Sequence, residues 1–392
     1  MVKPSIHRPT KATVNLKAIE HNINWLKSQI DDKQKIYATV KADGYGHGAV
    51  EVSRAAIRAG AKGLAVATVD EAIEIRQAGL VQVPILVLGL TNPRGIVDIL
   101  QYNLTITVGD AEFFRLAYEE LKATNQLELL SLYNLDVHLA VDTGMSRIGV
   151  TTKEAINSFT KEIRDFPWVN WIGAFTHFST AGGGPEEYVE FQWQAWLELN
   201  EFLPVGVTER HFANSAMGMW HNERAPKSTI IRFGIAMYGI DPKDALSTDS
   251  DLKLVEETSI AALQPALELT TEIIHVKQVP AGTSISYGAT YQSAQEEWIA
   301  TLPIGYADGW HRHYSVVPVL IDGEYAEVAG TINMDQMMVR LPKAYPVGTE
   351  VTLIGKNSGL ENHPSMIAKK VGTIGYEILT SIGPRVPRVY WS

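Results

Sequence analysis

The first two-thirds of the chain alternates short runs of hydrophobic, often β-branched residues with longer amphipathic stretches. The runs predict eight strands, at residues 36–40, 63–67, 85–89, 104–108, 135–141, 171–178, 209–212 and 230–234. The stretches predict helices between them, such as 17–30, 69–78, 111–122, 152–165 and 185–202. Strands separated by helical crossovers of this length favour a parallel α/β architecture.

The alternating region spans about 240 residues, close to the roughly 250 that are typical of a (β/α)8 barrel. A doubly wound open sheet is the alternative for the same order of elements. Its dinucleotide-binding form carries a Gly-x-Gly-x-x-Gly fingerprint after the first strand, and this chain has none there. The sequence therefore favours a TIM-type barrel.

The pattern changes near residues 249–254. From Ala266 onward the residues alternate as in strands, and the predicted strands are 267–279, 298–302, 317–321, 327–329, 337–341 and 350–354. Turn signals at 280–282 and 322–323 separate some of them. We predict an α/β barrel domain over 12–252 and a mainly antiparallel β domain over 253–392, with residues 1–11 packing with the second domain.

Composition narrows the classes of function. The formal net charge of -10 makes the chain a poor candidate for binding nucleic acid or anionic lipid. The lack of cysteine excludes disulfides and thiolate chemistry, and the histidines show no metal-ligand spacing. The N-terminal residues do not resemble a secretory signal, and no apolar stretch approaches the roughly 20 residues of a membrane span. We expect a cytoplasmic protein with no metal site, no nucleic-acid partner and no membrane partner.

Lys41 follows the first predicted barrel strand and begins the segment KADGYGHG. In a barrel, the carboxyl end of a strand lies on the catalytic face. Three glycines within five residues let the backbone approach a ligand closely. A lone lysine in this place is more often a surface residue before a flexible turn, so both interpretations stay open at this point.

The segment VKADGYGHG is similar to the pyridoxal-lysine signature of alanine racemases. Further segments resemble the same family in the same order along nearly the whole chain, namely AVDTGMSRIG, THFSTA, HFANSA, IIRFGIAMYG, SYGATY, IGYADGW, INMDQ and GTIGYEILTSIGPRVPR. The resemblance implies a barrel followed by a β domain, pyridoxal 5'-phosphate as cofactor, and interconversion of L-alanine and D-alanine. It also implies a cytoplasmic isomerase that supplies D-alanine for peptidoglycan and forms a homodimer with active sites shared between subunits.

Racemisation sets its own requirements. The α-proton of an amino acid leaves only if an electron sink stabilises the carbanion, and pyridoxal phosphate supplies that sink. Proton donors or acceptors are then needed on both faces of the planar carbanion. Lys41 is the natural group for one face, provided that its pKa falls well below roughly 10.4. The resemblance assigns the other face to Tyr287 of the partner subunit, although from the residues alone Tyr287 could equally be a strand aromatic before a turn.

Arg232 lies inside an apolar predicted strand, where an unpaired cation is costly. A structural ion pair would explain it. The resemblance instead places Arg232 against the pyridine nitrogen of the cofactor, where a cation weakens the electron sink and disfavours side reactions. It places His177 beside Arg232, and a satisfied core histidine is the alternative for that residue.

The cofactor phosphate needs hydrogen-bond donors, and a helix start can supply them. The resemblance implies that they come from the hydroxyl of Ser215, the amides of Gly234 and Ile235, and the phenols of Tyr45 and Tyr376. Ser215 could also be only the N-cap of a helix.

The residues that would contact the substrate are assigned from the resemblance alone. Arg147 would reach the phenolic oxygen of the cofactor and the substrate carboxylate. Met334 and Asp335 of the partner subunit would lie near that carboxylate, and Tyr306 and Arg312 would line the entry corridor. Each of them could also be ordinary loop or strand structure.

Ala140 departs from the family pattern. Many relatives carry a lysine seven residues before the arginine matched by Arg147, and its carbamylated side chain braces that arginine. Ala140 forms no carbamate, so we hypothesise that a bound anion or ordered water occupies the space. Gly182, Thr331 and Gly375 replace an acid, an arginine and an asparagine that are common in the family, which predicts a looser entry corridor and a more mobile loop around Gly375.

Three other functions are compatible with parts of this pattern. A racemase of broader range, acting on serine, lysine or other amino acids, would use the same residues. A non-catalytic protein that binds pyridoxal phosphate would lack the second domain, so SYGATY and NMDQ argue against it. A two-domain decarboxylase would need a catalytic cysteine, which this chain lacks.

Overall fold

The computed structural model describes residues 3–221, 223–245 and 262–392, which form two compact units. The barrel unit is built from the described residues within 19–44 and 49–264. The sheet unit is built from those within 1–18, 45–48 and 265–392. The predicted change of pattern near 249–254, and with it the predicted boundary at 252/253, lies outside the described residues.

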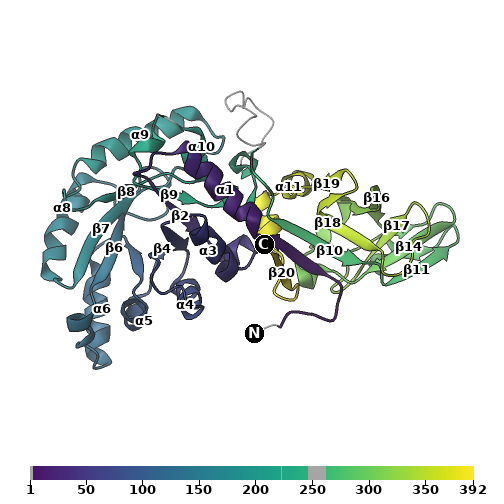
Figure 1. Ribbon diagram of the computed structural model, residues 1–392, viewed down its shortest axis with the longest axis horizontal. Coiled ribbons are helices and arrows are strands. Elements are labelled where there is room, and N and C mark those ends of the chain that lie inside the picture. The colour runs from purple at the N-terminus through teal and green to yellow at the C-terminus, as the bar shows by residue number, and fades with distance from the viewer. Residues whose placement is uncertain (1–2, 222, 246–261) are drawn as a thin grey trace. The chain divides into compact units, whose positions relative to one another are not determined.

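Eight parallel strands form one sheet in the barrel unit, in the order β8-β7-β6-β5-β4-β3-β2-β9 (Figure 1). Their bounds are β2 (Lys35–Thr39), β3 (Gly63–Val66), β4 (Ile85–Leu90), β5 (Thr105–Val108), β6 (Leu135–Ala140), β7 (Val169–Phe175), β8 (Glu209–His211) and β9 (Ile230–Phe233). A parallel bridge between Ala213 and Ile231 joins the two ends of this order, so the sheet nearly closes. The predicted eight strands and the predicted barrel are confirmed.

Helices lie along the outer side of this sheet (Figure 1). They are α1 (Leu16–Gln29), α3 (Ala49–Arg58), α4 (Val69–Gln77), α5 (Ile96–Gln101), α6 (Glu112–Ala123), α7 (Leu129–Leu132), α8 (Lys153–Glu162), α9 (Glu186–Asn200) and α10 (Ser215–Trp220). The strands are covered on both faces, which is why β3 reads as an unbroken hydrophobic run and is buried throughout. The five predicted helices are confirmed to within a few residues at each end.

Helix α4 shows how local sequence starts these helices. Its N-cap Thr68 accepts a hydrogen bond from the amide of Glu71 at 3.3 Å, and the Glu71 carboxylate accepts one from the amide of Thr68 at 3.2 Å. This capping box satisfies backbone donors that the first turn leaves unpaired. The start of α4 is therefore encoded by two side chains three residues apart.

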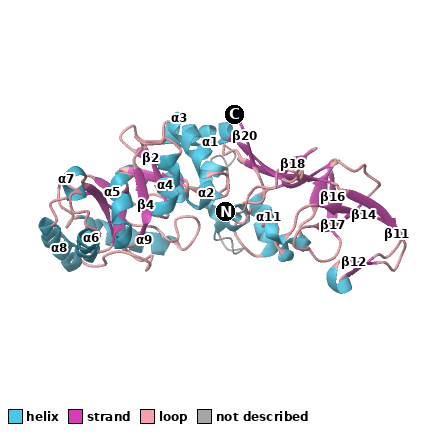
Figure 2. Cartoon of the chain, turned by 90° about the horizontal axis from the view of Figure 1, so that it is seen from below, coloured by secondary structure: helices cyan, strands magenta, loops and turns pink. Residues whose placement is uncertain are grey.

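A ten-stranded sheet organises the sheet unit, in the order β11-β14-β17-β16-β15-β18-β10-β1-β20 with β19 beside β18 (Figure 2). Neighbours are antiparallel except β1 and β20, which pair in parallel. The strands are β1 (Lys11–Asn15), β10 (Leu267–Glu272), β11 (His275–Val279), β14 (Glu297–Leu302), β15 (Val319–Ile321), β16 (Glu324–Val328), β17 (Met337–Leu341), β18 (Glu350–Asn357), β19 (Leu360–Asn362) and β20 (Arg388–Trp391). A separate hairpin joins β12 (Ser284–Ile285) to β13 (Tyr291–Gln292), and two helices follow β19, α11 (Pro364–Val371) and α12 (Gly375–Thr380). The predicted mainly antiparallel second domain is confirmed in its fold class.

One predicted strand, 267–279, is wrong as a single element. It is two strands, because β10 pairs with β18 whereas β11 pairs with β14. The amide of Ile273 bonds to the carbonyl of Thr349, and the next amide, of Ile274, bonds to the carbonyl of Thr301. The chain thus changes its hydrogen-bonding partner strand between two consecutive residues. The alternation of hydrophobic and polar residues does not indicate such a change.

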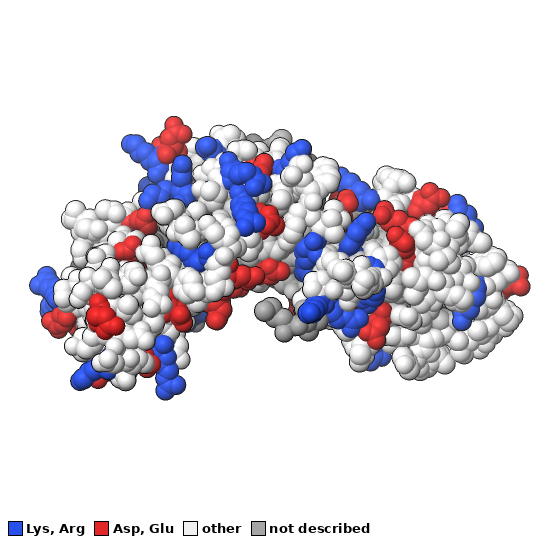
Figure 3. Space-filling model, turned by 60° about the horizontal axis from the view of Figure 1, so that its bottom comes forward, with Lys and Arg blue, Asp and Glu red and all other residues white. Residues whose placement is uncertain are grey.

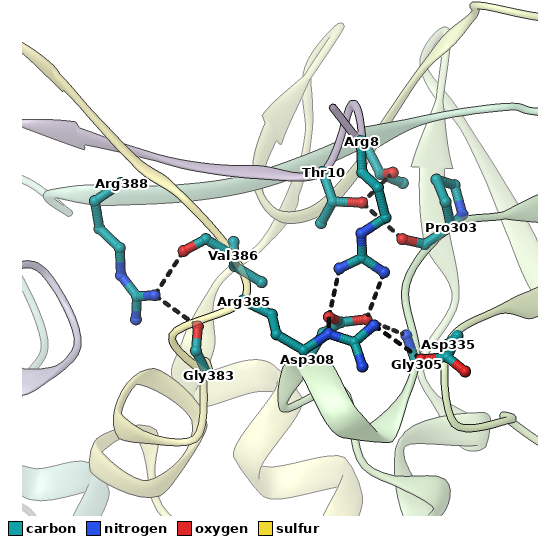
Figure 4. A network of polar contacts seen from close by, with 11 residues as sticks. Arg8, Thr10, Pro303, Gly305, Asp308, Asp335, Gly383, Arg385, Val386 and Arg388 are labelled. Atoms are coloured by element: carbon teal, nitrogen blue, oxygen red, sulfur yellow. Dashed lines mark hydrogen bonds and ion pairs between the residues drawn. The ribbon is translucent and has the colours of Figure 1, made fainter. Parts of the chain in front are cut away.

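A buried carboxylate joins distant segments of the sheet unit (Figure 4). Asp308 is fully buried, accepts two hydrogen bonds from Arg8, at 2.5 and 3.2 Å, and forms an ion pair with Arg385 at 3.0 Å. It also accepts from the amide of Gly305 at 3.0 Å. Arg385 reaches on to Asp335 at 2.8 Å. The N-terminal segment is therefore tied to the C-terminal segment through one buried charge.

The described helices include none that is both long enough and apolar enough to cross a membrane. Basic and acidic side chains both occur on the face of each unit seen in Figure 3. Among the described residues, no group of three or more histidine, aspartate or glutamate side chains is arranged to hold a metal ion.

We expect Asp308→Asn to lower the free energy of unfolding by about 1–3 kcal/mol, because it removes the buried charge that accepts from two partly exposed guanidinium groups and a backbone amide. Chemical denaturation of the full chain measures this change. Asp322→Asn is the matched control, since its ion pair with Lys343 is exposed and worth about 0–1 kcal/mol. Equal losses in the two variants would contradict a structural role for the buried charge.

Candidate active site

The carboxyl ends of parallel strands share one end of a barrel. The structure places there Lys41, as expected, and six further residues to which the sequence analysis gave a role toward cofactor or substrate. They are Lys41 after β2, Arg147 after β6, His177 after β7, Ser215 after β8, Arg232 in β9, and Gly234 and Ile235 after β9. The resulting end of the barrel combines cations, a histidine and hydroxyl and amide donors.

Lys41 sits two residues beyond β2, and its surroundings favour the neutral amine. Burial lowers its pKa from the ordinary 10.5, and the positive charges of Arg147 and Arg232 lower it further, while Glu71 opposes them. A neutral lysine amine can act as a nucleophile or a base. The environment therefore suits both roles that the sequence analysis predicted for Lys41.

Arg232 is buried in β9, and among the described residues no carboxylate forms an ion pair with it. Its Nη2 donates to the carbonyl oxygens of Thr176 at 2.9 Å and Phe212 at 3.2 Å. The guanidinium also lies over the ring of Phe175, 5.2 Å from its centroid. The structural ion pair considered as an explanation for this residue is not seen in the part of the chain that the structure describes, and carbonyl groups and an aromatic face hold the cation instead.

A chain of buried imidazoles leads away from Arg232. Its Nη1 lies 2.6 Å from Nδ1 of His211, and Nε2 of His211 lies 2.8 Å from Nδ1 of His138. Arginine has no acceptor, so Nδ1 of His211 must be unprotonated and its proton must sit on Nε2. His138 then accepts at Nδ1 and faces Glu209 with Nε2, at 3.2 Å. Neither histidine was predicted as part of the site, because His138 and His211 look like core residues of β6 and β8.

Glu209 ends this chain with a negative charge. Burial raises its pKa, but hydrogen bonds from His138 and from Lys35, the latter at 2.6 Å, outweigh burial and lower the pKa to about 2. The polar chain thus runs from Arg232 through the rings of His211 and His138 to an ionised carboxylate. This arrangement fixes the tautomer of each ring and the direction of each hydrogen bond.

His177 is neutral in this setting. Its burial lowers its pKa to about 3, and the nearby charges of Arg232, Arg147 and Lys41 act in the same direction. Its Nδ1 lies 3.4 Å from Nη2 of Arg232, in line with the predicted contact. Gln192, a buried residue of α9, holds the segment from behind by donating to the carbonyl of His177 at 3.0 Å.

The alternative reading of Ser215 as a helix N-cap is wrong. Asn214 caps α10 by accepting from the amide of Met217 at 2.9 Å. Ser215 is the first residue of that helix, and its hydroxyl oxygen accepts from the amide of Gly234 at 2.9 Å. The structure therefore brings together Ser215 and the backbone at Gly234 and Ile235, which the sequence analysis assigned to one task.

Asp142 organises the loop that carries Arg147. Its carboxylate accepts from the amides of Gly144, Ser146 and Arg147, all within 2.9–3.0 Å. The backbone of Arg147 is thus braced although Ala140, buried in β6, offers no side chain for that purpose. An aspartate followed by a glycine at two residues is a turn signal, and it could have identified Asp142 in the sequence.

The sheet unit carries the remaining predicted residues. Tyr287 follows β12, and its side chain is 74% exposed in the single chain. The preceding Ser286 has a positive φ of 67°, and its hydroxyl donates to the carbonyl of Thr331 at 2.6 Å. Thr331 in turn donates to the carbonyl of Tyr287 at 3.3 Å. Thr331, predicted to loosen the corridor, is here a support of the Tyr287 turn.

Met334, Asp335 and Tyr306 lie on two loops that pack backbone to backbone. The amide of Tyr306 bonds to the carbonyl of Asn333, and the amide of Ala307 bonds to the carbonyl of Met334, both at 3.0 Å. A Cβ on Gly305 would stand 2.3 Å from the carbonyl oxygen of Asn333, so only glycine allows this approach.

Four further residues named in the sequence analysis lie in the sheet unit, namely Arg312, Tyr45, Tyr376 and Gly375. Arg312 begins the short 3-10 helix that follows the Tyr306 turn, and it is exposed. The rings of Tyr45 and Tyr376 are 6.1 Å apart. Gly375, predicted to lie in a loop, is instead the first residue of α12, so the predicted loop there is wrong.

Comparison with known proteins identifies the family. The model described as "Alanine racemase, N-terminal domain" matches residues 14–242, and "Alanine racemase, C-terminal domain" matches residues 266–390. The chain belongs to the alanine racemase family. An alanine racemase of Ligilactobacillus salivarius is 43% identical over 389 residues, which are 98% of each chain.

Solved structures of the family share the whole fold. The alanine racemase of E. faecalis is 40% identical, with a TM-score of 0.90 over 100% of both chains. A histidine racemase from Leuconostoc mesenteroides is 30% identical, with a TM-score of 0.87 over 100% of both chains. The architecture is therefore common to racemases whose names state different substrates.

Acid unfolding should report the charge at the end of the imidazole chain. The pKa of Glu209 is lowered from 4.5 to about 2, so its ionised form stabilises the fold above the unfolded pKa and this stabilisation is lost as the pH falls toward about 2. We expect the unfolding free energy of the wild type to fall more steeply below about pH 5 than that of Glu209→Gln, by up to about 3 kcal/mol. Glu187→Gln, which removes an exposed carboxylate from α9, should keep the wild-type slope. Identical slopes for wild type and Glu209→Gln would contradict the assignment.

Proposed function

We propose that the protein is a pyridoxal-phosphate-dependent alanine racemase that interconverts L-alanine and D-alanine. The proposal rests on the surroundings of Lys41, together with the membership of the chain in this family. A lysine amine of lowered pKa stands at the carboxyl end of the barrel, and Arg147, Arg232 and His177 act on it or on one another electrostatically.

The residues of the barrel unit fit pyridoxal phosphate. Lys41 supplies the amine that binds its aldehyde, and Ser215 with the amides near Gly234 supplies donors for its phosphate. Arg232 supplies a cation with no carboxylate partner among the described residues, suited to face the ring nitrogen. A concentration of positive charge at one end of the barrel also attracts an anionic cofactor and substrate.

When bound, pyridoxal phosphate supplies the electron sink that stabilises the substrate carbanion. Lys41 removes or returns the α-proton at one face of the substrate, and its lowered pKa keeps a useful fraction of the amine unprotonated. Arg232 retains its proton at neutral pH, since burial lowers its pKa only to about 9. It would therefore donate a hydrogen bond to the ring nitrogen and keep its own proton.

Tyr287 of the partner subunit serves the opposite face in this proposal. The family resemblance supports it, and so does the 74% exposure of the Tyr287 side chain in the single chain, which leaves the phenol free to reach a second copy. The hydrogen bonds from Ser286 and Thr331 hold the backbone of that turn in place. The active enzyme is then a homodimer in which neither subunit alone completes a site.

The substrate side follows from the same assignment. Arg147 would bind the substrate carboxylate, with Met334 and Asp335 of the partner subunit beside it, and Tyr306 and Arg312 would line the way in. Tyr45 and Tyr376 would add phenolic donors to the phosphate. Alanine is the substrate we favour, because the relatives named above as alanine racemases are 40–43% identical and the histidine racemase is 30% identical. A role in supplying D-alanine for peptidoglycan and a cytoplasmic location stay predictions of the resemblance.

Lys41→Ala should abolish both the visible absorption of the protein with pyridoxal phosphate and the racemisation of L-alanine. The reason is that the same amine holds the cofactor and moves the proton. Absorption spectra and a chiral assay, run with alanine, serine, lysine and histidine, measure these effects and the substrate range. Lys62→Ala, which removes an exposed lysine, is the control and should behave as wild type. A wild-type protein that racemises alanine without bound pyridoxal phosphate would contradict the proposal.

Tyr287→Phe should slow exchange of the α-proton with solvent for one alanine enantiomer by about 10²–10⁴-fold, and for the other much less. Lys41 still serves its own face in this variant. Deuterium incorporation from D2O into each enantiomer distinguishes the two faces. Tyr325→Phe, an exposed tyrosine of β16, is the control. Equal slowing of exchange in both enantiomers would rule out a two-base scheme.

A further inference from the structure

The backbone after Lys41 adopts a left-handed helical turn. Ala42, Asp43 and Gly44 have φ of 52°, 52° and 61°, and Tyr45 also has φ of 52°. The amide of Gly44 closes the turn on the carbonyl of Val40 at 2.8 Å. Left-handed helix costs roughly 1–2 kcal/mol for each residue that has a Cβ. Three such residues within four positions persist only if their surroundings hold them.

Glu71 of α4 holds the first residue of this turn. Its Oε1 accepts from the amide of Ala42 at 2.7 Å, across 29 positions of sequence. Its Oε2 accepts from the amides of Ala67 at 2.7 Å and Thr68 at 3.2 Å, which fixes the carboxylate to the start of the helix. In the capping box, Glu71 needs only the bond to the amide of Thr68. The bond to the amide of Ala42 therefore does not serve the helix cap.

The far end of the turn is held by its own side chain. Asp43 accepts from the amide of Ala49, the first residue of α3, at 2.8 Å. The phenol of Tyr238 donates to the carbonyl of Thr39 at 3.0 Å, just before the turn. Both flanks are thus held by side chains, and the Glu71 carboxylate holds the residue that directly follows Lys41.

We propose that Glu71 is the positioning residue for Lys41, holding the strained turn so that the lysine amine points to the end of the barrel where the cofactor binds. The inference rests on the proposed function for the cofactor, but the held turn itself belongs to the chain. Glu71 also brings a negative charge that acts on Lys41 against the positive charges of Arg147 and Arg232. One carboxylate therefore sets both the direction and the electrostatic balance of the amine.

Glu71→Gln tests the proposal in the full-length protein, with Asp70→Asn as matched control. Both variants remove one negative charge from the first turn of α4, but the Asp70 side chain is exposed and makes no bond to the turn. An amide in place of the Glu71 carboxylate cannot accept at both oxygens. Attachment of pyridoxal phosphate to Lys41, trapped with borohydride and measured by mass spectrometry of the peptide, should slow by on the order of tenfold to a hundredfold in Glu71→Gln only.

Steady-state kinetics separate positioning from general damage. We expect kcat for L-alanine to fall by about tenfold or more in Glu71→Gln while KM stays within about twofold, since the substrate-binding residues are untouched. A lower melting temperature with unchanged attachment rate and unchanged kcat would reduce Glu71 to a helix cap and overturn the proposal. Behaviour identical to that of Asp70→Asn would overturn it as well.

Ala42→Gly provides the complementary test. Glycine adopts a positive φ without the Cβ penalty, so the turn in this variant depends less on Glu71. We expect Ala42→Gly to restore attachment several-fold in the Glu71→Gln background and to change the wild type little. Purely additive losses in the double variant would overturn the claim that Glu71 acts by holding this turn.

Hydrogen exchange at the Ala42 amide, measured without cofactor, tests the role of Glu71 independently of the proposed function. The amide should exchange faster in Glu71→Gln than in Asp70→Asn, because its acceptor is lost. If the wild type takes up no pyridoxal phosphate, the proposed function fails whatever the exchange rates are. If the wild type is an active racemase and the Ala42 amide exchanges equally in both variants, only the role of Glu71 fails.

Discussion

Arg232 carries a buried positive charge at the end of the barrel, and its desolvation constrains everything that packs around it. Burial of a guanidinium that contacts no carboxylate among the described residues is costly unless its N–H groups find other acceptors. Backbone carbonyls after β7 and β8 accept from one side of the guanidinium, and Nδ1 of His211 accepts from the other. This last bond sets the tautomer of His211, and through it that of His138, with Glu209 as the anionic end. The same charge helps to keep His177 neutral and the pKa of Lys41 low.

Three carboxylates accept hydrogen bonds from backbone amides at or next to predicted site residues. Glu71 accepts from the amide that follows Lys41, and Asp142 from the amide of Arg147. Asp308 accepts from the amide of Gly305, next to Tyr306, while two arginines neutralise it. A carboxylate offers several lone pairs and can fix more than one strand of backbone at once. Loops that would otherwise vary are thus held in single, partly strained conformations.

Much of the fold could be predicted from residue patterns, because a parallel barrel buries whole strands and its helices are amphipathic. The errors have a common cause. The run 267–279 is two strands, since a change of hydrogen-bonding partner leaves no trace in alternation. Ser215 is not the cap of α10, and Gly375 opens a helix where a loop was predicted, since both depend on which neighbour satisfies the backbone. The assigned site residues rest on motif resemblance, and their roles stay predictions.

The sequence by itself determined the strand and helix order, the absence of cysteine chemistry, the motif around Lys41 and the family that the motifs resemble. It determined these because they follow from local periodicity and residue type. Only the tertiary structure decided that Lys41 precedes a left-handed turn held by Glu71, and that Arg232 is stabilised through His211 and His138. Those facts join residues 21, 29 and 73 positions apart, and sequence patterns do not report which distant acceptor lies within about 3 Å of a buried donor.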